Sequence, residues 1–324
     1  MITAPVCLWI LMFASLLLLA CAQSGIPTPA AETGNTAGVA ANTSATVMPS
    51  TQMASRTMAP TNTQVPPQST DPPVPQATQP ATAATEPAAD IWRPKPGTDW
   101  QWQLNALPID LSIDVDMYDI DLFDNDAATV AALHAAGRKA VCYLNAGGWE
   151  DWRPDAAEFP EGIIGANLDD WNGERWLDIR RIDLLAPIME ARMDLCRQKG
   201  FDGIEPDNID GFLNDTGFPL TSGHQLEYNI WLAEAAHRRG LSIGLKNDMD
   251  QIDVLLSHYD WALNEQCFEY DECETLLPSI EAGKAVFNVE YALETGEFCE
   301  KARALGFNSL RKNLDLGSWL DPCG

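Results

Sequence analysis

The stretch 184–207, LLAPIMEARMDLCRQKGFDGIEPD, decides the fold of this chain. A helix is predicted over Leu184–Lys199 and ends at Gly200, because glycine readily adopts the left-handed conformation that closes many helices. A short strand, Gly203–Asp207, follows directly. A helix-ending glycine followed at once by a strand is typical of a parallel sheet whose strands are joined by helices.

The same unit recurs on both sides of this stretch. Further helices are predicted at Ala127–Ala136, Gln225–Arg239, Asp250–Ser257, Cys273–Ala282 and Glu297–Leu305. Further strands are predicted at Trp100–Leu104, Val115–Phe123, Ala140–Asn145, Trp176–Ile179, Ser242–Lys246, Ala262–Glu265, Ala285–Val289 and Ser309–Lys312. So many repeats favour the α/β class, with a closed (β/α)8 TIM barrel rather than an open doubly wound sheet. Because the candidates outnumber the eight places by one, we expect Trp100–Leu104 or Trp176–Ile179 to be peripheral.

The chain begins with a short apolar segment. The run from Val6 to Ala20 is about 15 residues long, shorter than the ~20 that a spanning helix needs. It ends in Leu-Leu-Ala-Cys, which resembles a bacterial lipoprotein signal over residues 1–20, cut before a lipid-carrying Cys21. A basic segment before the apolar run is missing, so an ordinary secretory signal or anchor stays open. Either interpretation predicts an exported protein, anchored in the bacterial cell envelope through Cys21 or secreted.

A low-complexity segment follows the signal. Residues 21–91 are rich in Thr, Pro, Ala, Gln and Ser and contain almost no aromatic side chains. Such a segment cannot bury enough apolar surface to offset the entropy of ordering it, so we expect a disordered tether. As a coil its ends are on the order of 50 Å apart. The segment is either a spacer through an envelope layer or a tail with no role beyond solubility. The folded domain is expected at residues 92–324.

The folded part of the chain is strongly acidic. Residues 100–324 contain 17 Lys and Arg against 42 Asp and Glu, a balance of −25 within a net charge of −27. This balance excludes ordinary nucleic-acid binding, which needs cations on the phosphates. An acidic surface suits a neutral or cationic partner, although it is also typical of any soluble secreted protein. No Gly-x-Gly-x-x-Gly follows the first strand, so we expect no dinucleotide cofactor. We also expect the protein to be a monomer.

Cysteine usage agrees with export. Beyond Cys7 and Cys21, the six cysteines are Cys142, Cys196, Cys267, Cys273, Cys299 and Cys323. An even number in an oxidising compartment predicts disulfides, and Cys267 and Cys273 are close enough to close one loop. Six cysteines allow 15 connectivities, so Cys142–Cys196 and Cys299–Cys323 are one hypothesis among these. The sequence contains neither Cys-x-x-Cys nor His-Glu-x-x-His, so no metal site is expected.

Polar side chains collect at the predicted C-terminal ends of the strands, where a barrel opens its active face. Asp207 and Glu265 end separate strands. Glycoside hydrolysis needs one acid for the leaving oxygen and one carboxylate across the anomeric carbon, and a barrel can direct both into one cleft. Carboxyls at strand ends also serve as helix caps or ion-pair partners. Glu205 competes with Asp207, because alternation places both side chains on one face of the strand.

Several blocks of the sequence, in order, resemble glycoside hydrolase family 114. They are Val115–Asp121, Cys142–Gly147, Trp176–Arg180, Phe201–Asp210, Gly244–Asp248, Asn264–Cys267 and Phe287–Tyr291. The resemblance extends over Trp100–Gly324 and implies a barrel-shaped endo-α-1,4-polygalactosaminidase. It also implies that Asp207 and Glu265 are the catalytic pair of a retaining enzyme, with Asp207 as nucleophile and Glu265 as general acid/base.

The resemblance implies a substrate whose deacetylated sugars carry ammonium groups, and an acidic domain would attract such an exopolysaccharide. The side chains expected to bind it are Asp119, Tyr143, Asn145, Trp149, Trp152, Asp178, Glu205, Lys246 and Glu290. Tryptophan faces suit the apolar C–H faces of sugars. Two roles are open for Lys246: it anchors the Asp207 carboxylate and lowers its pKa, which keeps a nucleophile ionised, or it forms a structural ion pair elsewhere.

Two alternatives remain open from the sequence. The first is a barrel hydrolase that acts on a different, partly deacetylated glycan. The second is a lipid-anchored protein that holds polysaccharide without cutting it, which the presence of both expected acids disfavours.

Overall fold

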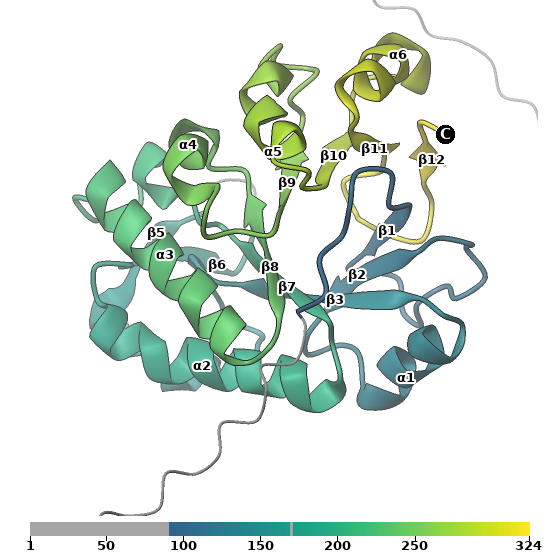
Figure 1. The fold of residues 1–324 in the computed structure, drawn as a ribbon. Helices are drawn as coiled ribbons and strands as arrows, with labels where there is room; N and C mark the ends of the chain where they lie inside the picture. Colours follow the sequence, from purple (N-terminus) through teal and green to yellow (C-terminus); the bar gives the residue numbers. More distant parts are fainter. Residues whose placement is uncertain (1–90, 169–170) are drawn as a thin grey trace, which may run out of the picture. The chain divides into compact units, whose positions relative to one another are not determined.

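The computed structural model describes residues 91–168 and 171–324, and its centre is a parallel sheet that curls on itself (Figure 1). Parallel strands follow one another around this sheet in chain order. They are β1 (Trp100–Gln103), β2 (Met117–Asp121), β3 (Lys139–Asn145), β7 (Gly203–Asp207), β8 (Ser242–Lys246), β9 (Trp261–Glu265), β10 (Val286–Glu290) and β11 (Asn308–Arg311). A short strand, β12 (Asp321–Pro322), pairs antiparallel with β11.

Side chains connect the first and last parallel strands. Trp100 Nε1 donates to the carbonyl of Asn308 at 2.9 Å, and Lys312 Nζ donates to Gln101 Oε1 at 2.8 Å. In the described part of the chain, no backbone ladder pairs β1 with β11. The strand order and direction are those of the (β/α)8 TIM barrel, so the predicted fold class is confirmed.

Helices pack outside this sheet. They are α1 (Ala127–Ala135), α2 (Ile182–Lys199), α3 (Ser222–Arg238), α4 (Ile252–Leu255), α5 (Leu277–Glu281) and α6 (Thr295–Leu305). Short 3-10 turns lie at Ala156–Glu158, Glu161–Ile163, Gly211–Leu213, Met249–Gln251 and Cys273–Leu276. α2 ends at Gly200, whose φ of 95° is in the left-handed region that glycine adopts without strain. The fully described connection from β1 to β2 contains no helix, which departs from the predicted repeat.

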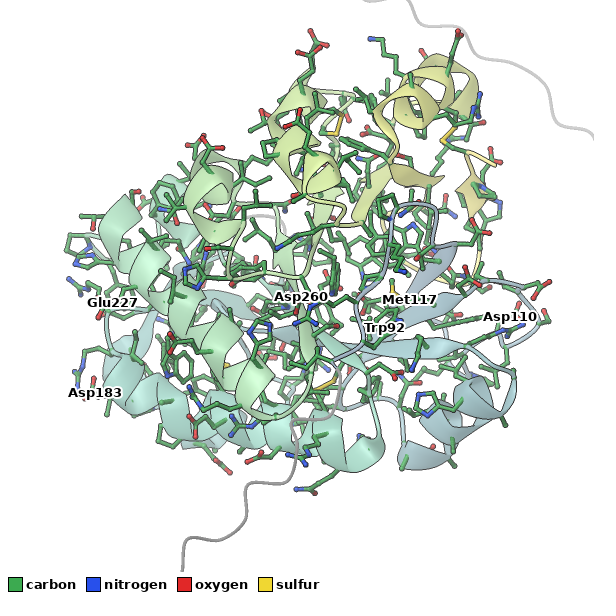
Figure 2. The ribbon with its side chains drawn as sticks, in the orientation of Figure 1. Trp92, Asp110, Met117, Asp183, Glu227 and Asp260 are labelled. Atoms are coloured by element: carbon green, nitrogen blue, oxygen red, sulfur yellow. A yellow bond between two sulfur atoms is a disulfide. The ribbon has the colours of Figure 1, made fainter. Side chains whose placement is uncertain are left out.

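The inward faces of the strands form layers. The layer toward the N-terminal ends is apolar, with Trp100, Met117, Trp261 and Phe287 at most 1% exposed. Figure 2 shows Met117 inside the molecule, whereas Asp183 and Glu227 project from the outer faces of α2 and α3. The next inward layer is polar. Burying charge is costly unless it is paired, so this polar layer is a candidate for function.

A three-stranded antiparallel sheet is inserted between β3 and α2. Its strands are β4 (Gly148–Glu150), β5 (Ile164–Asn167) and β6 (Glu174–Leu177), in the order β4-β6-β5. The predicted strand around Trp176 therefore lies outside the barrel, and Trp100–Gln103 is a barrel strand. This resolves which of the two short strands is peripheral.

Three disulfides have the predicted pairing. Cys142–Cys196 joins β3 to α2, and Cys267–Cys273 closes a loop after β9. Cys299–Cys323 joins α6 to the C-terminal segment. Each bond limits the freedom of the unfolded chain and so stabilises the fold.

The predicted signal peptide, the lipidation site Cys21 and the tether fall within residues 1–90, outside the described residues. Within residues 91–168 and 171–324, no helix is long and apolar enough to cross a membrane.

Candidate active site

A cavity of about 1020 Å³ opens at the C-terminal ends of the barrel strands. Asp207, Lys246 and Glu265 are the last residues of β7, β8 and β9, and all three line it. Because β8 pairs with both β7 and β9, its last residue lies between the other two. Neighbouring parallel strands therefore bring two carboxyls and one ammonium together.

Lys246 connects the two carboxyl groups. Its Nζ lies 2.8 Å from Asp207 Oδ1 and 3.2 Å from Glu265 Oε2, and its side chain is 3% exposed. Two oxygens this close to one nitrogen are at most about 6 Å apart, near enough to act on one sugar. The Asp207 and Glu265 side chains are 20% and 26% exposed, so both can meet a ligand in the cavity.

Asp207 is held by several donors. Lys246 Nζ donates to Oδ1, Tyr143 Oη donates to Oδ2 at 2.8 Å, and the Asn208 amide donates to Oδ1 at 2.9 Å. Burial alone would raise the pKa of Asp207. The Lys246 charge and these hydrogen bonds outweigh burial and lower the pKa below its ordinary value. Asp207 is therefore a carboxylate rather than a carboxylic acid at neutral pH.

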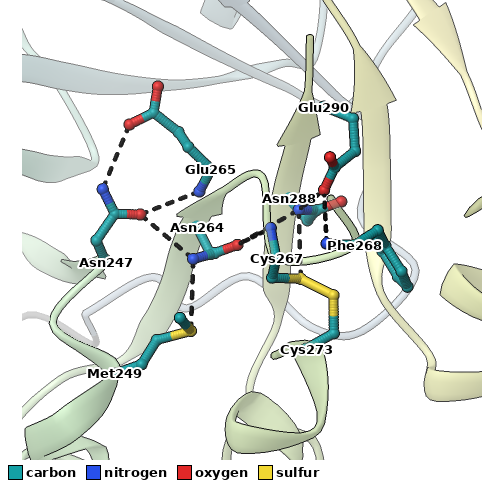
Figure 3. The surroundings of a disulfide bond; sticks show 9 residues. All are labelled: Asn247, Met249, Asn264, Glu265, Cys267, Phe268, Cys273, Asn288 and Glu290. Atoms are coloured by element: carbon teal, nitrogen blue, oxygen red, sulfur yellow. Dashed lines mark hydrogen bonds between the residues drawn. A yellow bond between two sulfur atoms is a disulfide. The ribbon is translucent and has the colours of Figure 1, made fainter. Parts of the chain in front are cut away.

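Glu265 has a different set of partners. Tyr291 Oη donates to its Oε1, and Asn247 Nδ2 donates to its Oε2 at 3.3 Å. Asn247 also accepts from the Glu265 amide at 3.0 Å, so one side chain orients both the backbone and the carboxyl group (Figure 3). Burial and the Glu265 charge raise the pKa of Tyr291 well above its ordinary value, so its hydroxyl remains a donor.

Two further acids lie beneath this pair. Asp119 of β2 and Glu205 of β7 are 0% exposed and lie outside the cavity lining. Trp102 Nε1 donates to Glu205 Oε2 at 2.9 Å, and Lys246 Nζ lies 3.3 Å from Glu205 Oε1. Alternation along β7 thus directs Glu205 and Asp207 toward the same ammonium from different depths in the barrel.

The model of glycoside-hydrolase family GH114 matches residues 81–324 of this chain. The chain belongs to this family. The resemblance seen in the sequence blocks is confirmed, and the protein is a glycoside hydrolase.

Solved structures agree with the family. Ega3 of Aspergillus fumigatus, crystallised in complex with galactosamine, is 40% identical with a TM-score of 0.69 over 74% of this chain and 100% of that chain. The glycoside hydrolase domain of PelA from Pseudomonas aeruginosa has a TM-score of 0.55 at 15% identity, over 68% of this chain and 96% of that domain. The likeness to PelA shows the fold alone. A comparison with curated proteins finds no match.

Several of the predicted binding residues reach the cavity of this glycoside hydrolase. Tyr143 and Lys246 line it beside Asp207. Trp152 also lines it and is 53% exposed, an unusual position for so large an apolar side chain unless a ligand covers it.

Other predicted residues are brought close to the site but behind its surface. Asn145 is 1% exposed, and its Nδ2 donates to Glu174 Oε2 at 3.1 Å while its Oδ1 accepts from the Gly148 amide. Trp149 is half-buried, donates to the carbonyl of Ala156 and lines an adjacent smaller cavity of about 470 Å³. The structure thus places Asn145 as a support for its neighbours.

Four of the predicted substrate-binding carboxyls lie elsewhere. Asp178 is 5% exposed and forms a two-point ion pair with Arg180, at 2.7 Å for both bonds. Glu290 is 0% exposed and accepts from the Phe268 amide at 2.9 Å, which holds the loop of the Cys267–Cys273 disulfide (Figure 3). Asp119 and Glu205 are the other two, because they occupy the layer below the cavity. None of the four lines this cavity.

Much of the acidic wall of the cavity was not predicted from the sequence. Twelve carboxyl side chains line the cavity against the cations Arg153 and Lys246. Burial, followed by nearby negative charge, raises the pKa of Glu174 to about 7, of Asp210 to about 6 and of Asp248 to about 8. In the described residues, no group of three or more His, Cys, Asp or Glu is arranged to hold a metal ion.

A signal for some of these residues was present. Asp210 and Asp248 each lie at the end of a block that resembles the family. Glu174 belongs to β6 of the inserted sheet, and a barrel pattern does not direct that sheet to the cavity.

Backbone geometry also marks the site. Asn208, Asn247 and Gln266 directly follow the three strand-ending residues and have φ angles of 60°, 49° and 65°. Left-handed φ values are uncommon outside glycine, and such strain gathers at functional sites. Three successive strands therefore turn sharply just after presenting a side chain to the cavity.

Proposed function

We propose that this chain hydrolyses an α-1,4-linked, galactosamine-rich polysaccharide, cutting within the polymer and retaining the anomeric configuration. The observation that carries the proposal is the position of Asp207 and Glu265 on either side of Lys246 in one acidic cavity. Retaining enzymes hold their carboxyls ~5–5.5 Å apart and inverting enzymes ~6.5–9.5 Å apart. An oxygen separation of at most about 6 Å supports retention.

The partners of each carboxyl group support their roles. Asp207 is kept ionised by Lys246 and Tyr143, as a nucleophile requires. In the first step Glu265 donates a proton to the leaving glycosidic oxygen while Asp207 bonds to the anomeric carbon. In the second step Glu265 takes a proton from water, and the water oxygen displaces Asp207. The enzyme returns to its starting state with one bond hydrolysed.

The charge of the cavity supports an amino-sugar substrate. Twelve lining carboxyls create a negative potential that favours ammonium groups. Trp152 and Trp171 are each 53% exposed at this cavity and offer faces for sugar rings. Ega3, the relative at 40% identity, was crystallised with galactosamine.

A panel of polymers tests the substrate. De-N-acetylated poly-galactosamine, chitosan and a neutral glycan are incubated with the protein, and products are sized by mass spectrometry. We expect short oligosaccharides from poly-galactosamine and little from the others. Equal cleavage of chitosan would contradict the proposed specificity for poly-galactosamine. Binding without cleavage would overturn the proposal that the protein is an enzyme. NMR of the first product gives the stereochemistry, and a β-anomer would contradict retention.

We further propose that the protein is exported as a monomer and held at the envelope through a lipid on Cys21. Three disulfides in the folded part support an oxidising compartment. Metabolic labelling with a fatty-acid analogue tests the anchor. We expect label on the wild type and none on Cys21→Ser, and unlabelled wild type in the medium would indicate a secreted protein instead.

A further inference from the structure

The site holds more carboxyls than Lys246 alone can neutralise. Glu205, Asp207 and Glu265 lie around the Lys246 ammonium, Asp119 lies against Glu205, and Asp119 and Glu205 are 0% exposed. A buried charge without a partner is very costly, so a carboxyl in such a place is paired or protonated.

Asp119 has no ordinary partner. In the described residues, neither of its carboxyl oxygens meets an N–H or O–H donor. The polar group against which it lies is the carboxyl of Glu205, itself only an acceptor when ionised. An ionised Asp119 would thus leave two buried acceptors unsatisfied beside another negative charge. A proton on Asp119 turns the contact into a carboxylic acid–carboxylate hydrogen bond, which gives Glu205 a donor and removes the buried charge from Asp119.

We infer that Asp119 and Glu205 share one proton and act as a positioning pair that holds Lys246 between Asp207 and Glu265. Burial and the charge of Glu205 raise the pKa of Asp119 well above its ordinary value. Burial likewise raises the pKa of Glu205, to about 7, against the opposing effect of Lys246. Both pKa shifts are upward, which agrees with a proton held between the two carboxyl groups.

The geometry of Lys246 explains what the pair does. The Lys246 ammonium donates a hydrogen bond to Asp207 Oδ1 at 2.8 Å and forms ion pairs with Glu265 at 3.2 Å and Glu205 at 3.3 Å. Asp207 and Glu265 change charge during the proposed reaction, since negative charge moves from one to the other. Glu205 does not react, and Trp102 Nε1 fixes its other oxygen. Glu205 is thus the constant partner that keeps Lys246 in place, and this role rests on the proposed function.

Every titratable or charged group that faces the pair is part of the site. They are Lys246, Asp207, Glu265, Tyr143 and Tyr291. Removing the Glu205 charge relieves repulsion on Asp207, so the pKa of Asp207 falls further. The acid limb of the kcat/KM profile then moves to lower pH.

Infrared spectroscopy tests the shared proton without any substrate. The difference spectrum between wild type and Asp119→Asn at pH 7 should contain a protonated carboxylic acid C=O band. Asp178→Asn, which removes a buried carboxyl paired with Arg180, is the matched control and should lack that band. A difference spectrum with only carboxylate bands would overturn the shared proton, whether or not the protein cleaves poly-galactosamine.

Kinetics test the positioning role. Asp119→Asn keeps a neutral donor and should retain kcat within about 3-fold, whereas Asp119→Leu, similar in size without a donor, should lose about 10-fold or more. Glu205→Gln should lower kcat with KM nearly unchanged and move the acid limb down by about one pH unit. Equal losses in both Asp119 variants, or an unmoved profile in a folded Glu205→Gln, would overturn the role.

Discussion

Strands β7 and β9 each begin after an aspartate and end in a carboxyl group, and the two ends of each strand differ in how these groups share partners and how far they are exposed. Asp202, just before β7, lies 2.7 Å from Lys139 Nζ and 2.8 Å from His134 Nε2 and accepts from the Ala140 amide. Each of its oxygens has a partner. At the other end of the same strand, Asp207 shares its ammonium with further carboxyls.

Strand β9 repeats this contrast. Asp260, just before it, accepts from Arg93 Nε at 2.6 Å and from the Ile243 amide, and lies 2.8 Å from His237 Nε2 (Figure 2). Glu265, at its far end, is partly exposed to the cavity. Carboxyls at the N-terminal ends are satisfied within the fold and stabilise it. Those at the C-terminal ends are left with shared partners and free surface, which is what a substrate needs.

The largest expected effect is the loss of the proposed nucleophile. Asp207→Asn should lower kcat by on the order of 10⁴-fold or more, because the amide cannot form the covalent intermediate. Hydrolysis of poly-galactosamine measures this effect, and thermal unfolding should show a folded protein. Activity close to that of the wild type would contradict the role of Asp207 as nucleophile, and with it the functional difference between the two ends of β7.

Glu265→Gln should cost less, about 10²- to 10⁴-fold, because it removes proton transfer and leaves the nucleophile in place. A synthetic substrate whose leaving group needs no protonation should restore the first step in this variant, and added azide should yield a glycosyl azide. The same rescue in Asp207→Asn rather than in Glu265→Gln would exchange the two roles.

At the N-terminal end, Asp260→Asn should reduce stability and leave kcat unchanged. The expected loss in unfolding free energy at pH 7 is about 2 kcal/mol, since the buried Ile243 amide and the charges of Arg93 and His237 lose a carboxylate acceptor. Burial would raise the pKa of Asp260, but His237 and Arg93 lower it below its ordinary value. The contribution is therefore present above the unfolded pKa of about 4 and is lost as pH falls through the folded pKa.

Urea unfolding at pH 7 and at pH 3 measures this change, and the difference between wild type and Asp260→Asn should shrink at pH 3. Asp194→Asn is the matched control, because Asp194 pairs with Arg239 at the surface and should contribute at most about 0.5 kcal/mol. A large fall in kcat for Asp260→Asn would show that the two ends of β9 are not separate in function.

The smallest expected effect is a gain in stability at the C-terminal end. Burial, then the Asp210 charge, raises the pKa of Asp248 to about 8. Between pH ~4 and pH ~8 the folded state keeps a proton that the unfolded chain has lost, so stability declines as pH rises. Asp248→Asn removes this decline and should raise the unfolding free energy by about 1 kcal/mol at pH 8, or about 2–4 °C in Tm.

At pH 5 the gain from Asp248→Asn should be much smaller. Asp253→Asn, at an exposed position on α4 outside the cavity lining, changes the net charge by the same amount and is the matched control. Equal Tm values for wild type and Asp248→Asn at both pH values would mean that the cavity acids are as well satisfied as those at the opposite end.

Much of the fold could be predicted because its signals are local. Glycines such as Gly200 end helices, and short apolar strands follow them, which identifies the repeating unit. In a barrel built from such units, the strands lie side by side in the order in which they occur in the chain. The connection from β1 to β2 and the inserted sheet were harder to predict, because the sequence of a short strand such as Glu174–Leu177 does not indicate which sheet the strand joins.

The candidate site could be predicted in part. Asp207 and Glu265 were identified by their places at strand ends and by the family resemblance, and Lys246 by its place at the end of the strand between them. Asp119 and Glu290 were expected in the cleft and are buried instead. Alternation predicts that a side chain points inward, but not how deep in the barrel its layer lies.

The sequence by itself determined which strands follow one another and which strand-ending residues face the barrel interior, since these depend on short-range periodicity. Only the tertiary structure decided how deep each side chain lies and which groups it contacts. Asp207 reaches the cavity while Glu205 does not, and one ammonium group lies near three carboxyls. The physical reason is that the curl of the sheet and the packing of its layers set distances between strands that are far apart in the chain.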